Sequence, residues 1–322
     1  MKRRFILVNE EKFYGPLRHG LERLGLQTIG NDWTPGAATL QETLACFVGF
    51  YDCLRYPIKV WRLRQHLRRS GVPLVAWNRD APHYMNRKPW RLDLLDHARL
   101  LDIYATHTLI DTSRQFADTV LYLANGVDAD TYAIKGNATE TMAKLRDPAQ
   151  YQWDVSFFGS MDGDRYKEMR NREAFFAQLT ERLRDSGIRF LFREAAGMSV
   201  AEQIALIQNS RINLNYGASC EYGAAVASGL PERCYGIPAV GGFLLCDRRT
   251  HALTDFTPGQ NWAEFNDLDD CVKKIRFWLA HFDRARELAE NCHQHVISHH
   301  TYQHRATTLH AALLDWHQTR RS

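Results

Sequence analysis

Apolar and polar positions alternate along the first half of the chain in a pattern typical of an α/β protein. Apolar runs at 4–8, 44–50 and 72–77 have the length and composition of buried strands. Apolar residues spaced over 17–24 fall on one helical face. Residues 58–69 predict a basic amphipathic helix with a solvated face, or, as an alternative, a contact with an anionic acceptor or a lipid surface. The other elements expected in this half are strands at 103–104, 108–110 and 120–123 and a helix at 90–101.

The same alternation restarts in the second half of the chain. Residues 132–152 lose their periodicity and gain polar character, which predicts a linker between domains. Repeated strand and helix units favour a doubly wound parallel sheet, so the chain is assigned to the α/β class with two such domains. The elements expected here are strands at 154–158, 188–192, 212–214 and 243–245, helices at 166–184 and from 267 onward, and a Ser199–Glu202 capping box opening a further helix.

Two domains also follow from the length of 322 residues, because single hydrophobic cores seldom extend past ~250–300 residues. The expected division is a first domain over 1–140, a second over 141–300, and a C-terminal helix over 301–322. Ligands of open parallel sheets bind at the carboxyl ends of the strands. Two such domains face to face would therefore hold a ligand in the cleft between them.

Composition excludes several classes of protein. The net charge of +4 is too small to indicate a nucleic-acid partner. No apolar run approaches the ~20 residues of a membrane span, and the run near the start is too short for a signal peptide. The seven cysteines are odd in number and contain no C-x-x-C pair. This usage is typical of reduced thiols in a cytoplasmic protein, and no zinc site is expected.

The stretch 210–249 carries the strongest chemical signal. It predicts a strand, a loop, a short helix and a second strand, with glycines at the turns. Backbone N–H groups at such a turn and helix start hold a phosphate without any cationic side chain. This pattern indicates a nucleotide-type ligand.

Five segments, in this order along the chain, resemble motifs of the CgeB-like glycosyltransferases, part of the broad group 1 of glycosyltransferases. They are LYLANGVDADTY (121–132), YQWDVSFFGS (151–160), SRINLNYG (210–217), RCYGIPAVGGFLLCD (233–247) and HTYQHRA (300–306). The resemblance covers the second domain well, and the first only through 72–80 and the NGVD turn. It implies the GT-B architecture, in which two Rossmann-like domains face each other across a cleft and a C-terminal helix crosses back to the first domain.

The resemblance also implies an activity. Such enzymes move a sugar from a nucleotide sugar, here a UDP- or GDP-sugar, to an acceptor hydroxyl. The first domain would lie on the acceptor side and the second would bind the donor. Transfer would need no metal and no cofactor, and would be retaining. The acceptor expected is a glycan, a lipid-linked sugar or a protein, and nucleic acid is not expected as a partner.

The resemblance and the strand ends together select donor-binding residues in the second domain. Each has a structural alternative: the glycines serve close packing or an ordinary turn, and the arginines lie on a solvated helix face or pair with a nearby carboxylate. The donor-binding residues expected are Gly159, Ser160, Arg165, Arg172, Asn215, Tyr216, Glu232, Arg233, Gly241 and Gly242.

One departure from the family pattern concerns the ribose of the donor. The glutamate that usually binds ribose is replaced by Gly236, and a second glutamate expected eight positions upstream is replaced by Ser228. Either Glu232 or Glu221 substitutes from a shifted loop, or ribose is held differently, or the chain is a degenerate member of the family.

In the first domain, Asp80 and His83 follow an apolar strand. They therefore lie at the carboxyl end of a strand, where open sheets carry their binding and catalytic residues. They are the candidate catalytic residues, because in an inverting enzyme a carboxylate or histidine takes the proton of the acceptor. In a retaining enzyme the donor phosphate accepts that proton. The alternative for Asp80 is a turn in which it bonds its own backbone.

A metal site is not expected. D-x-D pairs occur at 128–130, 162–164 and 267–269, and the last opens a helix, as a cap does. The middle pair lies after Gly159, so the sequence leaves a metal there open, although a cap is favoured. His300 and His304 have i, i+4 spacing but lack the remainder of a metal motif, so packing is the preferred interpretation.

Two other functions remain compatible with the sequence. A non-catalytic binder of sugar nucleotides would keep the fold without the glutamates. An epimerase acting on sugar nucleotides would share the architecture and need no acceptor. A dinucleotide dehydrogenase is disfavoured because no G-x-G-x-x-G follows a predicted strand.

Overall fold

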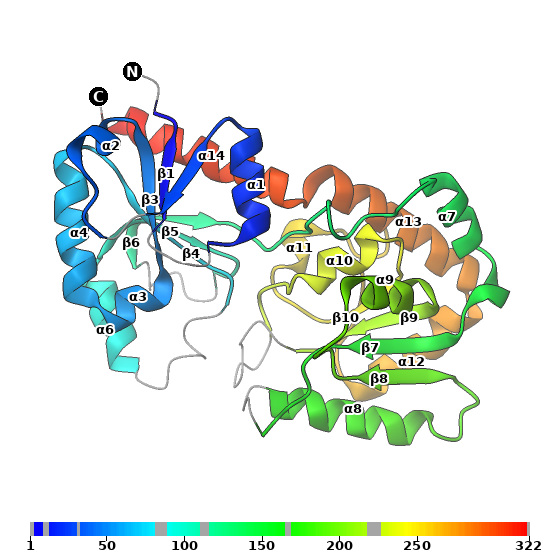
Figure 1. Ribbon diagram of the computed structural model, residues 1–322. Helices are drawn as coiled ribbons and strands as arrows, with labels where there is room; N and C mark the ends of the chain where they lie inside the picture. The colour runs from blue at the N-terminus through cyan, green and yellow to red at the C-terminus, as the bar shows by residue number, and fades with distance from the viewer. Residues whose placement is uncertain are drawn as a thin grey trace. The chain divides into compact units, whose positions relative to one another are not determined.

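The computed structural model describes residues 3–8, 13–30, 33–80, 89–109, 116–164, 169–217 and 227–320. The chain forms two compact units (Figure 1). The first consists of Met1–Asn125 with Tyr302–Ser322, and the second of Gly126–Thr301. The division after Asn125 lies earlier than the boundary at 140 expected from the sequence.

The first unit is built around a parallel sheet. Among the described residues, six strands follow the order β2-β1-β3-β4-β5-β6, and every neighbouring pair is parallel. The interior strands β3 and β5 are buried along their whole length, which explains their mostly apolar sequences. The strands are β1 (Phe5–Val8), β2 (Gln27–Gly30), β3 (Thr43–Gly49), β4 (Leu74–Asn78), β5 (Leu101–Thr106) and β6 (Ala117–Tyr122).

Helices cover both faces of this sheet. On one face, Val60, Leu63 and Leu67 of α4 pack with residues of α3 and α6 against the strands. On the other face, Leu17 and Leu21 of α1 pack with α14. The helices are α1 (Gly15–Arg23), α2 (Ala37–Gln41), α3 (Phe50–Arg55), α4 (Pro57–Arg69), α6 (Pro89–Ala98) and α14 (Tyr302–Thr319).

The C-terminal helix α14 is part of the core of the first unit. Its residues Leu309 and Leu313 are fully buried with α1 and the strands. Contact between α1 and α14 is so close that a Cβ at Gly20 would lie 2.8 Å from the Cβ of Ala306. The last helix therefore belongs to the first unit, although it follows the second unit in the sequence.

The second unit contains a second parallel sheet. Within its described residues the strand order is β11-β10-β9-β7-β8, and all neighbours are parallel. Two parallel sheets with alternating helices confirm the predicted α/β class with two Rossmann-like domains. The strands are β7 (Trp153–Phe158), β8 (Phe190–Arg193), β9 (Ser210–Asn215), β10 (Leu244–Asp247) and β11 (Ala263–Phe265).

Helices of the second unit also pack on both sides of their sheet. Helices α8, α12 and α13 share one apolar cluster with the strands, and α9 and α10 share the other. The predicted Ser199–Glu202 capping box is present at the start of α9. The helices are α7 (Ala138–Leu145), α8 (Arg170–Leu183), α9 (Val200–Gln208), α10 (Arg233–Ala239), α11 (Ala252–Asp255), α12 (Leu268–Ala280) and α13 (Phe282–His299), with a 3-10 turn at Pro148–Gln150.

The region expected to link the two domains lies instead inside one of them. Residues 132–152 lie inside the second unit and contain α7, whose first turn is capped by the side chain of Asn137. Within the described residues, none of the helices combines the length and the apolar character that crossing a bilayer requires.

Candidate functional site at the carboxyl edge of the second sheet

The carboxyl ends of three neighbouring strands bring polar groups to one edge of the second sheet. Gly159 directly follows β7, Asn215 ends β9 and Asp247 ends β10. Because all of these strands are parallel, the three positions lie at the same edge. Open parallel sheets bind their ligands at this edge.

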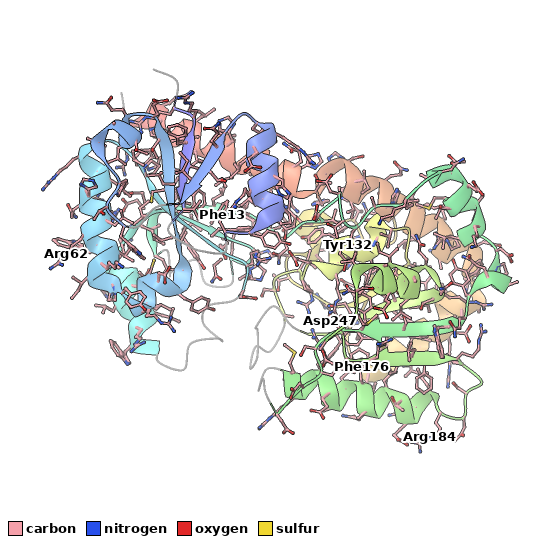
Figure 2. The ribbon with its side chains drawn as sticks, viewed as in Figure 1. Phe13, Arg62, Tyr132, Phe176, Arg184 and Asp247 are labelled. Atoms are coloured by element: carbon pink, nitrogen blue, oxygen red, sulfur yellow. The ribbon has the colours of Figure 1, made fainter. Side chains whose placement is uncertain are left out.

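Asp247 organises the centre of this edge (Figure 2). Its carboxylate accepts hydrogen bonds from Nδ2 of Asn215 at 2.7 Å and from the backbone N–H of Gly217 at 3.0 Å. It also forms an ion pair with Arg249 at 2.9 Å. The fully buried Arg249 donates to the carbonyls of Gly229 and Gly217 at 2.6 and 2.7 Å. These contacts fix the backbone where it leaves β9.

Arg172 joins two strand ends from α8. Its Nε donates to the carbonyl of Tyr216 at 2.8 Å, and its Nη1 donates to the carbonyl of Ser160 at 2.9 Å. The side chain is almost completely buried, and its Nη2 has no hydrogen-bond partner among the described residues. Arg172 therefore offers one unused donor nitrogen at the junction of the two loops.

Arg233, the first residue of α10, approaches the same edge. Its guanidinium lies over the ring of Phe157, 4.8 Å from the centroid. A Cβ added at Gly159 would lie 2.5 Å from Nη2 of Arg233, so a side chain at position 159 would displace the guanidinium. Within the described part of the chain, Nε and Nη1 of Arg233 are buried without a hydrogen-bond partner.

The charges at this edge are unbalanced. Burial, together with the neighbouring charges of Arg233 and Arg249, lowers the pKa of Arg172 to about 9. Burial also lowers the pKa of Arg233. Asp247 pairs with Arg249, and the carboxylates of Asp247 and Glu194 compensate part of the charge at Arg172. Arg172 and Arg233 still repel each other and have buried N–H donors without a partner among the described residues. Such an arrangement is suited to a multiply charged anion with several acceptor oxygens.

Further contacts hold the loops around these arginines. Glu194, which follows β8, accepts the backbone N–H of Met161 at 2.7 Å. The ring of Tyr216 stacks on Phe175, with centroids 3.8 Å apart. Asp247, Arg249 and Glu194 were not selected from the sequence as site residues, although each closely follows an apolar strand, which is the signal that would have found them.

Of the predicted donor-binding residues, six meet at this edge. Of the other four, Arg165 lies outside the described residues, and Glu232, Gly241 and Gly242 are described below. The six are Gly159, Ser160, Arg172, Asn215, Tyr216 and Arg233.

The prediction that Gly241 and Gly242 belong to this group does not fit the structure. Both precede β10 and therefore lie at the amino edge of the sheet. Gly241 has a φ of +82°, and a Cβ there would lie 2.7 Å from Leu145. A Cβ at Gly242 would lie 2.4 Å from Ile207. The two glycines are required by the turn and by close packing, which is the alternative the sequence offered.

Glu232 is exposed at the start of α10, next to Arg233. Gly236, at the position of the usual ribose glutamate, is buried, and a Cβ there would point at the ring of Tyr132, 3.5 Å away. The Tyr132 hydroxyl bonds Gln203 (Tyr132 is labelled in Figure 2). A ring thus lies beside the position from which the glutamate would extend. Glu221 lies outside the described residues.

The predicted catalytic residues belong to the first unit. Asp80 follows β4, is half-buried, and donates its backbone N–H to Oδ1 of Asn78 at 3.3 Å. The neighbouring Arg79 lies over the ring of Tyr14, 3.8 Å from the centroid. His83 lies outside the described residues. The catalytic assignment of both residues stays a prediction.

The D-x-D pairs that the structure explains have local roles. Asp267 caps α12 by accepting the N–H of Asp270 at 2.8 Å, as predicted. Asp128 accepts the N–H of Asp130 at 3.2 Å in a turn. Across the described residues, no three His, Cys, Asp or Glu side chains gather as metal ligands would.

Comparison with known proteins gives a family match and a set of similar folds. The family described as glycosyl transferase-like matches residues 142–311, which is more than half of the chain. No curated protein sequence matches this chain.

The similar solved structures are remote in sequence. Sucrose-phosphate synthase from Thermosynechococcus elongatus is 13% identical, with a TM-score of 0.62 over 99% of this chain and 100% of that one. Anabaena Alr3699/HepE in complex with UDP and glucose is 11% identical, with a TM-score of 0.60 over 97% of this chain and 100% of that one. The N-terminal domain of Candida albicans trehalose-6-phosphate phosphatase is 12% identical, with a TM-score of 0.60 over 98% of this chain and 97% of that one. At these identities the likeness concerns the fold.

Proposed function

Because the chain belongs to the glycosyl transferase-like family, we propose that it transfers a sugar from a nucleotide-sugar donor to an acceptor hydroxyl. The observation that carries this proposal is the pair of arginines at the carboxyl edge of the second sheet. Arg172 and Arg233 both have buried N–H donors without partners among the described residues. A diphosphate supplies the negative charge and the acceptor oxygens that these groups lack.

In this mechanism, the bond between the anomeric carbon of the sugar and the diphosphate oxygen breaks, and the diphosphate leaves with the electron pair. Arg172 and Arg233 stabilise the charge that develops on the leaving oxygen. A new bond forms between the anomeric carbon and the acceptor oxygen. Because guanidinium groups and backbone N–H groups supply the positive potential, we propose that transfer needs no metal ion.

We further propose a retaining reaction, in which an oxygen of the leaving phosphate takes the acceptor proton. The inverting alternative needs a base in the first unit, where Asp80 and His83 are the candidates. The two outcomes differ in the configuration of the product at the anomeric carbon. NMR of the product made by the wild-type chain distinguishes them.

Similar structures support a nucleotide-sugar ligand. Alr3699/HepE has been solved with UDP and with UDP-glucose, and its fold matches nearly the whole of this chain. By analogy, we propose that this chain uses a UDP- or GDP-sugar. The acceptor proposed is a glycan, a lipid-linked sugar or a protein.

A non-catalytic binder of sugar nucleotides is a second candidate. It is favoured by Gly236, which stands where the family usually has the ribose glutamate and packs beside Tyr132. A binder would hold the donor but would not cleave it. Slow release of nucleoside diphosphate from the donor therefore separates the two functions.

The test begins with a thermal-shift panel of nucleoside diphosphates and nucleotide sugars in the presence of EDTA. A ligand bound by the native state raises the melting temperature. We expect a shift with UDP or GDP species, followed by release of nucleoside diphosphate when the same sugar donor is incubated with the protein. Shifts without release would favour the binder, and a flat panel would overturn both functions.

A further inference from the structure

A second surface of the molecule has no role in the proposed transfer. Helices α3, α4 and α6 lie together on one side of the first sheet (Figure 1). Their outer side carries large apolar residues that are open to solvent: Ile58 is 68% exposed, Trp61 51%, Trp90 59% and Leu94 51%. Exposed apolar side chains that cluster in this way mark an interaction site.

These residues border a groove of about 550 Å³ between the three helices. Leu54 and Arg55 of α3, Ile58 and Trp61 of α4, and Trp90 of α6 all line it. Cys53 lies at its inner side and is buried. The groove and the exposed side chains therefore form one continuous apolar face, here called the α3–α4–α6 face.

The α3–α4–α6 face is bordered by positive charge. Helix α4 contains no acidic residue, and four of its Lys and Arg residues are exposed: Lys59, Arg62, Arg68 and Arg69. Of these, Arg68 lies 3.8 Å from the carboxylates of Asp102 and Asp118, so the border of positive charge rests on the other three. Figure 2 shows Arg62 on the outer side of this helix. The remaining arginine of α4, Arg64, is buried in an ion pair with Asp102 and stabilises the fold.

We propose that the α3–α4–α6 face docks onto the surface of an anionic lipid bilayer. Tryptophan side chains favour the boundary between lipid headgroups and acyl chains, and aliphatic side chains such as Ile58 and Leu94 favour the apolar side of it. Basic residues on the flanks are attracted to anionic headgroups. The face supplies all three features on adjacent helices.

Other occupants fit the face less well. A second copy that used the same face would bring Lys59, Arg62 and Arg69 of two chains together, and like charges repel. A nucleic acid would satisfy the arginines but would leave Ile58 and Leu94 facing a charged backbone. An anionic bilayer matches both the charge and the apolar groups.

The test uses co-sedimentation of the full chain with vesicles of phosphatidylcholine, alone and with phosphatidylglycerol added. We expect binding to the anionic vesicles and a loss of binding as salt is raised, because salt screens headgroup attraction. Two variants probe the face: Ile58→Ser with Trp90→Ser, and Arg62→Glu with Arg69→Glu. Each is expected to weaken vesicle binding by about tenfold or more.

Matched controls come from the second unit. Leu253 is 67% exposed, nearly the same as Ile58, so Leu253→Ser tests the loss of an exposed aliphatic side chain elsewhere. Lys135→Glu with Lys144→Glu tests the same change of net charge at other exposed lysines. Circular dichroism and melting temperature verify that all variants fold.

Binding that is lost in the face variants and kept in the controls would support the proposal. The proposal would be overturned by a lack of binding to anionic vesicles, by equal binding to neutral vesicles, or by an oligomer in sedimentation velocity that the Ile58→Ser and Trp90→Ser variant dissociates. Preferential binding of single-stranded RNA over vesicles would overturn it as well. Donor binding is measured in separate assays, so failure here leaves the proposed sugar transfer untouched.

Discussion

The guanidinium of Arg233 lies against Gly159 so closely that a Cβ at position 159 would be 2.5 Å from Nη2 and 2.8 Å from Nη1. Glycine is the residue that leaves space for this contact. The same guanidinium lies over the ring of Phe157, two residues earlier on β7. The end of β7 thus holds the Arg233 guanidinium in place, and its Nε and Nη1 have no hydrogen-bond partner among the described residues.

The first prediction concerns this contact between Gly159 and Arg233. Gly159→Ala is expected to displace Arg233 and to abolish most of the melting-temperature shift caused by a nucleoside diphosphate. Gly36→Ala is the control, because a Cβ at Gly36 meets none of the described residues within 4 Å. If Gly159→Ala keeps the full ligand-induced shift, Arg233 does not contact the ligand from its observed position.

The second prediction contrasts the two arginines of the site. Arg233→Met removes a partly buried cation that has no hydrogen-bond partner for Nε and Nη1 among the described residues, and replaces it with an apolar chain beside Phe157. The free energy of unfolding without ligand is expected to stay unchanged or to rise by about 1 kcal/mol. Arg172→Met instead removes the guanidinium that donates to the carbonyls of Ser160 and Tyr216. It should lower the free energy of unfolding without ligand by about 1–3 kcal/mol.

Both variants are expected to lose the ligand-induced thermal shift. Urea unfolding in the absence of ligand and thermal shift in its presence measure the two effects separately. Equal destabilisation by both variants would mean that Arg233 has a structural role that its contacts do not reveal.

The parts of the fold that could be predicted from the sequence are those with long buried elements. Strands β3 and β4 have almost continuous apolar sequences because both of their faces are covered, and β7 carries three apolar residues among its last four. Strand β2 was missed because it is a short edge strand with half-exposed residues. Helix α7 was missed because it begins with a capping asparagine in a polar region, and the pattern there has little apolar periodicity.

The residues of the candidate site could also be predicted only in part. Arg172 could be selected because it lies in a basic run on the helix predicted after Gly159, and Arg233 because it opens a family-like segment. Asp247 and Arg249 were missed because an acidic and a basic residue two positions apart look like ordinary surface charge until the fold buries them. Gly242 was misplaced because a glycine indicates a close contact without indicating its partner, which here is Ile207.

The third prediction concerns acid stability. Partial burial acts to raise the pKa of Asp154, but hydrogen bonds from Arg189 and the charges of Arg189 and Arg211 outweigh it and lower that pKa. A carboxylate with a lowered folded-state pKa stabilises the fold at pH values above its unfolded pKa of about 4. This contribution is lost as the pH falls through the folded-state pKa.

Asp154→Asn should therefore cost about 1 kcal/mol at neutral pH, the scale of a partly solvated ion pair. The difference from wild type should begin to shrink as the pH falls below about 4, where the unfolded carboxyl becomes protonated, and should reach its minimum below the lowered folded-state pKa, where the folded carboxyl is protonated as well. Urea unfolding of both proteins at pH 7 and at successively lower pH measures this difference in the free energy of unfolding. A difference that does not change with pH would assign the effect to hydrogen bonding alone.

The fourth prediction tests how the C-terminal helix joins the first unit. Gly20 on α1 faces α14, where a Cβ would lie 2.8 Å from Ala306 and 2.9 Å from the carbonyl oxygen of Tyr302. A valine there forces the two helices apart and loosens the packing of Leu309 and Leu313, so Gly20→Val should lower the free energy of unfolding by about 1–3 kcal/mol. Gly15→Val on the same helix is the control, since a Cβ at Gly15 would have no neighbour within 4 Å in the described part of the chain, and its cost should stay within about 0.5 kcal/mol. Equal melting temperatures for the two variants would show that the contact between α1 and α14 adds little to the stability of the first unit, because only Gly20→Val disturbs that contact.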